Sequence, residues 1–191
     1  MAKNPNPYGP QALTVQEATN LVAQRKQIVV TPTLTTSAIG GGDVLINSEE
    51  IPNAVLNPGG CSLLRGITLV DYDDDAIDIT LVFTQNSASI ATGTLPTGAD
   101  ITAANIAIAN VSSVVLLDRS AVAQVDIGHA KVAVFTEAAG GAATSDSTTA
   151  GGFIPVFLQA GTHSTSVYFT IITAANTWAA GDLEFHFNIE Y

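Results

Sequence analysis

Residues 183–191, LEFHFNIEY, decide the fold class, because they alternate strictly between apolar and polar side chains. Leu183, Phe185, Phe187, Ile189 and Tyr191 occupy every second position, and polar residues fill the positions between them. Successive side chains of a β-strand point to opposite faces of a sheet. The pattern therefore predicts a strand with one face in a core and the other outside it.

Similar strand candidates extend outward from this segment along most of the chain. In residues 76–84, Ile77, Ile79, Leu81 and Phe83 occupy alternate positions, which predicts a strand with one buried face. Glycine-rich turns, such as NPGG at 57–60, separate the candidates. The other predicted strands are residues 27–35, 43–51, 62–71, 111–117, 121–135, 152–160 and 164–173.

The number of strands indicates the architecture. We count about eight strands and almost no helix in the body, apart from a short helix within residues 101–110 that Thr102 caps. Many short strands separated by turns favour a sandwich or a barrel, and eight is the number of strands in a jelly roll. The sequence predicts an all-β, jelly-roll-type β-sandwich body over residues 27–191.

Residues 1–26 are predicted to be a separate element, a flexible arm followed by a short amphipathic helix. The first 13 residues are rich in Pro, Asn and Gly. Thr14 and Glu17 have the spacing of a capping box, and Val15, Ala18, Leu21, Val22 and Arg25 fall near one helix face. Such a helix cannot form a core alone, so it docks either on its own body or on a neighbouring chain.

The charge balance disfavours two classes of partner. Six Lys and Arg residues stand against 17 Asp and Glu, which gives a formal net charge of −11. Nucleic-acid binding requires a cluster of cationic residues, and the sequence contains none. An acidic surface also disfavours adsorption to anionic membranes. We therefore expect no nucleic acid and no membrane among the partners.

Other features of the sequence bear on redox chemistry and localisation. Cys61 is the one cysteine, so no intrachain disulfide can form, and we expect it to be a small, buried apolar residue. The first residues, MAKNPNPYGPQ, lack the apolar core of a signal peptide, and no apolar run reaches the length of a membrane span. Synthesis in the cytoplasm without a classical export signal is the expectation.

The segment VDYDDDAID contains the most conspicuous polar cluster of the chain. Alternate carboxylates in a loop can bind calcium, which makes Asp71, Asp73 and Asp75 candidate ligands. The glycine and the late glutamate of an EF-hand loop are absent. We favour the alternative, a solvated acidic turn between two strands, and expect no metal and no cofactor.

Histidine and tryptophan residues give no catalytic pattern. His129, His163 and His186 are scattered, and none has a nearby residue with which it would form a pair of metal ligands. Trp178 could bind a sugar or a partner if exposed, although burial under the sheet is the more common outcome. No nucleophile elbow and no phosphate-binding loop accompanies these residues. The sequence therefore favours a non-enzymatic protein.

Taken in order, several segments resemble a family of tailed-bacteriophage virion proteins with a jelly-roll body, the head decoration or cement proteins. The similar segments are GGCSLLRGITLVDYDDDAIDITLVFTQN at 59–86, ITAANIA at 101–107, GFIPVFLQAGTHSTSVYFTIIT at 152–173 and AAGDLEFHFNIEY at 179–191. The resemblance extends over residues 40–191. The segments 1–39 and 137–151 depart from it.

This resemblance implies a mechanical function on the capsid surface of a virion. It implies attachment to the major capsid protein, a homo-oligomer that is a trimer, and no cofactor. The arm and helix are the expected anchor, with Lys3, Leu21, Val22, Arg25 and Lys26 as partner-binding residues. Their basic charge would favour contact with an acidic neighbouring subunit.

Two other functions compete with this one. A fibre-tip or receptor- and carbohydrate-binding module of a phage also uses β-sandwiches, but needs an exposed aromatic pocket, and aromatic residues make up only 6% of the chain. A carbohydrate-active enzyme would need a carboxylate pair in a cleft with aromatic platforms. The sequence ranks the enzyme last.

Overall fold

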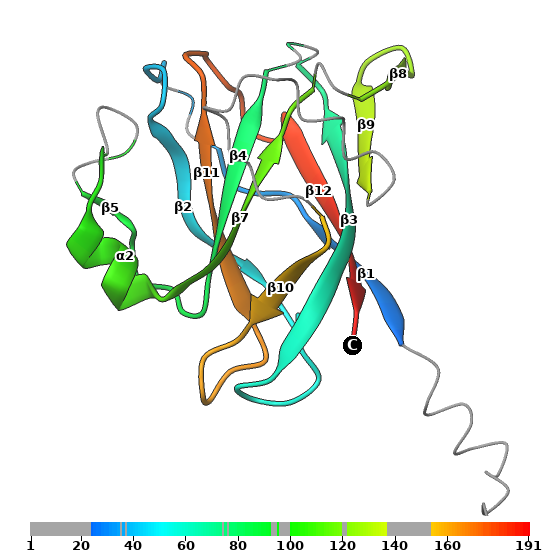
Figure 1. Ribbon diagram of the computed structural model, residues 1–191. Coiled ribbons are helices and arrows are strands. Elements are labelled where there is room, and N and C mark those ends of the chain that lie inside the picture. Colours follow the sequence, from blue (N-terminus) through cyan, green and yellow to red (C-terminus); the bar gives the residue numbers. More distant parts are fainter. Residues whose placement is uncertain are drawn as a thin grey trace, which may run out of the picture.

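The protein folds into two β-sheets that face each other (Figure 1). The computed structural model describes residues 24–136 and 154–191, except residues 35, 37, 74, 76, 93, 94, 96–99, 120 and 121. One sheet contains β1 (Arg25–Val30), β12 (Leu183–Glu190), β3 (Cys61–Asp71), β9 (Lys131–Thr136) and β8 (Gln124–Asp126), in that order. The other contains β2 (Val44–Ile51), β11 (Val167–Thr173), β4 (Ile79–Thr84) and β7 (Val111–Leu117), in that order.

The strand order of the two sheets is that of a jelly roll. The order β1-β12-β3-β9 faces the order β2-β11-β4-β7, and all of the pairings are antiparallel. Most steps along the chain cross from one sheet to the other, whereas β4 and β7 pair within one sheet. The long connections place the first strand of the chain beside the last. The predicted all-β sandwich is confirmed.

Strand β3 is the longest strand, and it pairs with three others. One edge pairs with β12 along most of its length. The other edge pairs with β9 through residues 66–71 and with β10 (Val156–Gln159) through residues 61–64. Strand β10 also lies against β7 of the opposite sheet, so it covers part of the opening between the two layers (Figure 1).

Phenylalanine rings from both sheets fill the centre of the core. Phe83 and Phe169 come from the four-stranded sheet, Phe185 and Phe187 come from β12, and all four are fully buried. The centroids of Phe169 and Phe187 lie 5.2 Å apart, and those of Phe83 and Phe187 lie 6.1 Å apart, both with near edge-to-face geometry. Such pairs contribute about 0.5–1.5 kcal/mol each beyond their buried area.

The strict alternation of the last strand is confirmed. Its apolar residues are buried and its polar residues are half-buried on the outer face. The predicted burial of Trp178 is also confirmed, at 1% exposure. In β4 the expected single buried face is incomplete, because Val82 on the opposite face is buried as well. It packs with Ile90 and Ala109 in a second, smaller apolar cluster.

The predicted short helix is confirmed as α2 (Ala103–Ala109), together with its cap. The side chain of Thr102 accepts a hydrogen bond from the amide of Asn105, and Asn110 ends the helix in the left-handed conformation. Two short strands, β5 (Ala91–Thr92) and β6 (Asp100–Ile101), pair just before the helix. Within the described part of the chain, no helix is long and apolar enough to cross a membrane.

Three local expectations were wrong. The single strand expected over residues 121–135 is a hairpin, in which β8 and β9 are separated by a turn that contains Gly128 with a φ of 101°. Cys61 is exposed rather than buried. Strand β1 begins at Arg25, so Arg25 and Lys26 belong to the sandwich and not to the helix predicted within residues 1–26. Residues 1–23, which contain the predicted arm and most of the predicted helix, and the loop at 137–151 lie outside the described residues.

Candidate interaction surface

Strand β3 contains a β-bulge, and Arg65 is its extra residue. Strand β12 pairs with Leu64 and then with Gly66, so Arg65 has no opposite residue in that ladder. A bulge shifts the alternation of side chains by one position and re-aims the bulged residue. Leu64 and Ile67 are accordingly both fully buried, although they lie three positions apart. The shift brings Arg65 to the outer face of the sheet, where it contacts β12.

On this outer face, two arginines hold the carboxylate of Glu190. Arg65 donates from Nε to Oε2 at 3.1 Å and from Nη2 to Oε1 at 3.3 Å, which is a bidentate pair. Arg25 of β1 donates from Nε to the same Oε2 at 3.2 Å. The hydrogen bond from Arg65 is the main cause that lowers the pKa of Glu190 below its ordinary value of 4.5, followed by the charges of both arginines, while desolvation opposes the shift.

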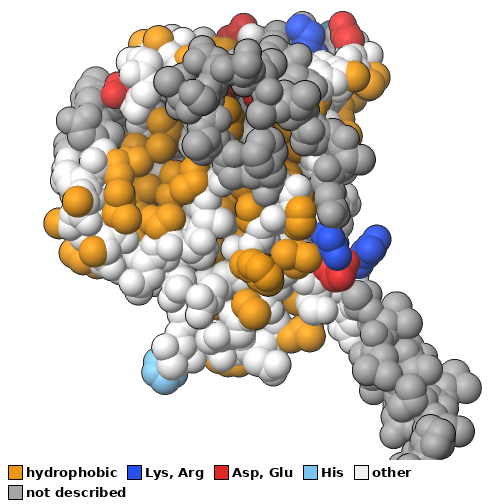
Figure 2. Space-filling view, viewed as in Figure 1, with side chains coloured by type: hydrophobic (Ala, Val, Ile, Leu, Met, Phe, Trp, Pro, Cys, Tyr) orange, Lys and Arg blue, Asp and Glu red, His pale blue; other side chains and the backbone are white. Residues whose placement is uncertain are grey.

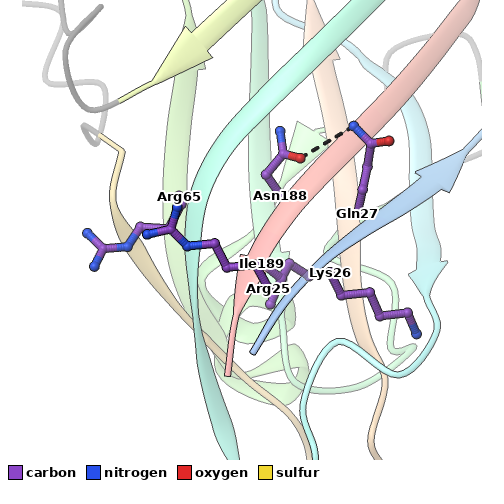
Figure 3. A pocket seen from close by; sticks show the side chains of 6 residues that line it. All are labelled: Arg25, Lys26, Gln27, Arg65, Asn188 and Ile189. Carbon is purple, nitrogen blue, oxygen red and sulfur yellow. Dashed lines mark hydrogen bonds between the residues drawn. The ribbon is translucent and has the colours of Figure 1, made fainter. Parts of the chain in front are cut away.

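A shallow pocket of about 260 Å³ opens beside this ion cluster. Its walls come from β1, β12 and β3, and its lining residues are Arg25, Lys26, Gln27, Arg65, Asn188 and Ile189. Figure 3 shows the side chains of both arginines extending to one side and that of Lys26 extending to the other. Gln27 donates to Asn188 at 3.4 Å across the two strands. The pocket therefore combines the two arginines with neutral amides, and the side chain of Lys26 extends away from them.

An exposed apolar group lies in line with the ion cluster. Pairing registers place Arg25 opposite Glu190, Glu190 opposite Leu63, and Leu63 opposite Phe157. These four residues, here called the outer row, cross β1, β12, β3 and β10 on the outer face. Phe157 is 69% exposed, the most exposed of the large apolar residues that the structure describes. Figure 2 shows the charged side chains beside apolar ones over this part of the sheet.

Positive charge is concentrated at this surface. Of the five Lys and Arg residues that the structure describes, three line the pocket, namely Arg25, Lys26 and Arg65. The other two, Arg119 and Lys131, lie near the opposite end of β3, beside Asp71. On a chain with a formal net charge of −11, the pocket is therefore an exceptional basic site.

At the opposite end of β3, Asp71 forms an ion pair with Arg119, and both side chains are completely buried. Arg119 also donates from Nη2 to Gln124 at 2.7 Å and from its backbone amide to Asp78 at 2.8 Å. The network joins the ends of β3 and β7 to β8 and to the start of β4. The expectation of a solvated acidic turn is therefore wrong for Asp71, which is part of the folded interior.

Asp73 and Asp75 of the turn lie at the surface. Asp73 is exposed, and its pKa is raised to about 6, first by desolvation of its carboxyl group and then by Asp75, Asp182 and Asp71. Asp75 accepts a hydrogen bond from the amide of Asn176 at 2.8 Å. In the described part of the chain, no group of three His, Cys, Asp or Glu residues is arranged to hold a metal ion.

The remaining sequence candidates do not converge on one site. His129 and His163 are exposed, whereas His186 lies 2.6 Å from a carboxylate oxygen of Glu184 on the outer face of β12. Of the predicted partner-binding residues, Arg25 and Lys26 line the pocket. Lys3, Leu21 and Val22 lie outside the described residues.

Sequence reasoning missed Arg65 and three members of the outer row, namely Glu190, Leu63 and Phe157. Arg65 is the one charged residue in the apolar run SLLRGITLV. A single charge within an otherwise apolar strand was the sequence feature that could have marked Arg65 as a candidate. Arg25 and Glu190 are 165 residues apart, so no local pattern could join them.

Comparison with known proteins did not identify a relative. No protein-family model matches the chain. A search of curated proteins likewise found no significant match.

Proposed function

We propose that the protein is a non-enzymatic decoration or cement protein of a tailed-phage capsid. In this function it attaches to the outer head surface, binds the major capsid protein, and bridges capsid subunits as a trimer. The jelly-roll architecture agrees with the resemblance of residues 40–191 to that family. Because one fold serves many functions, the fold alone cannot carry the proposal.

The outer row is the observation that carries the proposal. It presents exposed Arg25 and Phe157 on a rigid sheet, together with the half-buried Arg65. Arginine and aromatic side chains are enriched among the residues that dominate binding energy at protein interfaces. A surface of this composition suits attachment to another protein better than turnover of a small substrate.

The mechanism of a cement protein is mechanical. A protein that contacts two capsid subunits adds buried area across their joint, and separating the subunits then requires breaking these contacts as well. Several copies around one capsomer act together, because each contact holds the others at high effective concentration. A modest affinity of each copy is therefore sufficient to stabilise a shell.

A reconstitution experiment tests this function. Purified protein is added to phage heads that lack it, and binding is measured by co-sedimentation and by cryo-electron microscopy. We expect ordered density on the outer surface and a higher temperature of head disruption. Heads that bind no protein at micromolar concentration and disrupt at an unchanged temperature would contradict the proposal.

A carbohydrate-binding module of a phage fibre is the second candidate. The exposed ring of Phe157 favours it, because an aromatic face can pack against a sugar ring. Trp178 cannot contribute, since it is buried. Binding to a glycan array, abolished by Phe157→Ser, together with no binding to heads, would support this candidate over the first.

A further inference from the structure

The outer row has a charged half and an apolar half, and each half is suited to a different group. The charged half consists of Arg25 and Glu190, with Arg65 beside them, which leaves one net positive charge (two minus one) on the outer face. Lys26 is not counted, because it lies opposite the buried Ile189 and extends away from the two arginines. The side chain of Arg25 is 76% exposed. A guanidinium carries five donors in a fixed fork that fits carboxylates. An incoming carboxylate can therefore bind Arg25 without displacing Glu190, because only Nε of Arg25 is bonded to Glu190.

The apolar half contains Phe157 and Leu63. Phe157 is 69% exposed, and Leu63 lies opposite it in the β3–β10 ladder. Protein interfaces often combine an aromatic residue with arginines. At such a site, the partner can pack an apolar side chain on the ring and form a salt bridge with an arginine. Leu63 connects the two halves, because it is the register partner of Glu190 as well.

The spacing between the two halves defines the size of the occupant. From β1 to β10 the outer row crosses three gaps between neighbouring strands, or about 14 Å at the usual strand separation. An extended chain rises about 3.4 Å per residue, so about four residues connect a group at Arg25 to a group at Phe157. A short segment of polypeptide is long enough to contact both halves.

We propose that the outer face of β1, β12, β3 and β10 docks an acidic, extended segment of the partner protein. A carboxylate of this segment binds Arg25, next to the charge of Arg65, and an apolar side chain about four residues away packs on Phe157 and Leu63. Charge complementarity identifies the occupant, since the basic site lies on an otherwise acidic chain. The inference rests on the proposed function only in taking the capsid surface as that partner.

Amide NMR spectroscopy of the full chain provides a test that does not depend on phage heads. The probe is the peptide Asp-Asp-Thr-Thr-Phe-Leu, and the matched control is Lys-Lys-Thr-Thr-Phe-Leu, each titrated to millimolar concentration at low salt. We expect the acidic probe to shift the amide signals of Arg25, Leu63, Arg65 and Phe157. Equal shifts with both peptides, shifts confined to other elements, or none would overturn the proposal.

Variants separate the contributions of the two halves. The double variant Arg25→Gln/Arg65→Gln should weaken binding of the acidic probe by about tenfold, and Phe157→Ser by a smaller factor. Ile108→Ser is the matched control, because Ile108 is 63% exposed on α2, which covers the other sheet. Circular dichroism establishes that each variant is folded. Unchanged probe affinity in the double variant would overturn the proposal.

Binding of the same variants to heads distinguishes failure of this inference from failure of the function. If wild-type protein does not bind heads, the proposed function is wrong, and the peptide titration still decides the role of the face. If wild type and the double variant bind heads equally, the face is not the attachment surface. If light scattering shows that the double variant loses an oligomer which wild type forms, the occupant is a second copy and our assignment is wrong.

Discussion

Strand β3 has an arginine–carboxylate pair near each end, and the two pairs lie in opposite environments. Asp71 and Arg119 are completely buried, whereas Arg65 and Glu190 keep 34% and 17% of their side-chain surface exposed. The chemical groups are the same, but burial changes their energetics. A buried charge depends on its partner, while an exposed charge can exchange its partner for water. The first pair therefore maintains the fold, whereas the second lies on the face for which we propose binding.

The largest expected effect is the loss of the buried partner. Arg119→Met should lower the free energy of unfolding by about 3–5 kcal/mol, because it removes the buried cation that is paired with the carboxyl group of Asp71. Urea denaturation at pH 7 measures the change. Adding Asp71→Asn to this variant should recover part of the loss. If Arg65→Met destabilises the protein as strongly, the distinction between the two ends is wrong.

Removing the half-buried carboxylate of Glu190 should have a smaller effect on stability, and this effect should depend on pH. The pKa of Glu190 is lowered from 4.5, so its contribution to stability is complete above pH 4.5 and is lost as the pH falls below this value. Glu190→Gln should lower the Tm at pH 7 by no more than about 4 °C. The difference from wild type should then shrink in acid, as measured by calorimetry between pH 7 and pH 3. If the difference in Tm between Glu190→Gln and wild type grows as the pH falls, the pKa of Glu190 is not lowered in the folded protein and the prediction is wrong.

The acidic turn next to Asp71 should respond to pH with the opposite sign. The pKa of Asp73 is raised from 3.8 to about 6, so its charge destabilises the fold above pH 6 and this penalty disappears as the pH falls toward 3.8. Asp73→Asn should raise the Tm at pH 7 by about 1–2 °C, a small effect because the residue is exposed to solvent. The two melting curves should coincide near pH 3.5, and a gap that persists there would contradict the prediction.

The smallest expected effect lies at the first residue of β3. Cys61 is exposed, so Cys61→Ser should change the free energy of unfolding by less than about 0.5 kcal/mol. Its thiol should also react with a maleimide reagent in the native protein, as measured by mass spectrometry. Protection of the thiol until the protein is unfolded would show that this end of β3 is covered, and would weaken the contrast between the two ends.

Much of the fold could be predicted from the sequence because its signals are local. The alternation of residues 183–191 reports directly on the two faces of β12, and Thr102 caps α2 through a contact only three residues away. The turn between β8 and β9 was missed because apolar residues continue through Val125 and Ile127, both of which are exposed. Exposed apolar residues of this kind imitate the pattern of a longer strand.

The candidate surface could be predicted only in part, because its contacts are distant in sequence. Arg25 and Lys26 were among the expected partner-binding residues for their charge, although they were assigned to a helix. The partner of Arg25 depends on which strand pairs with β1, and no local pattern encodes this pairing. The burial of Asp71 likewise depends on Arg119, 48 residues away.

The bulge at Arg65 has a consequence for how such a surface can arise. On one edge of β3, the pairing with β10 ends at Leu64 and the pairing with β9 begins at Gly66. On the other edge, β12 pairs with Leu64 and with Gly66, so Arg65 has no opposite residue in any of these ladders. Without that residue, the alternation on both sides would join into one regular strand with the same face inward. Arg65 thus occupies the position of a one-codon insertion that the sheet accommodates. A single in-frame insertion is enough to add Arg65 to a complete sandwich, and a single in-frame deletion is enough to remove it.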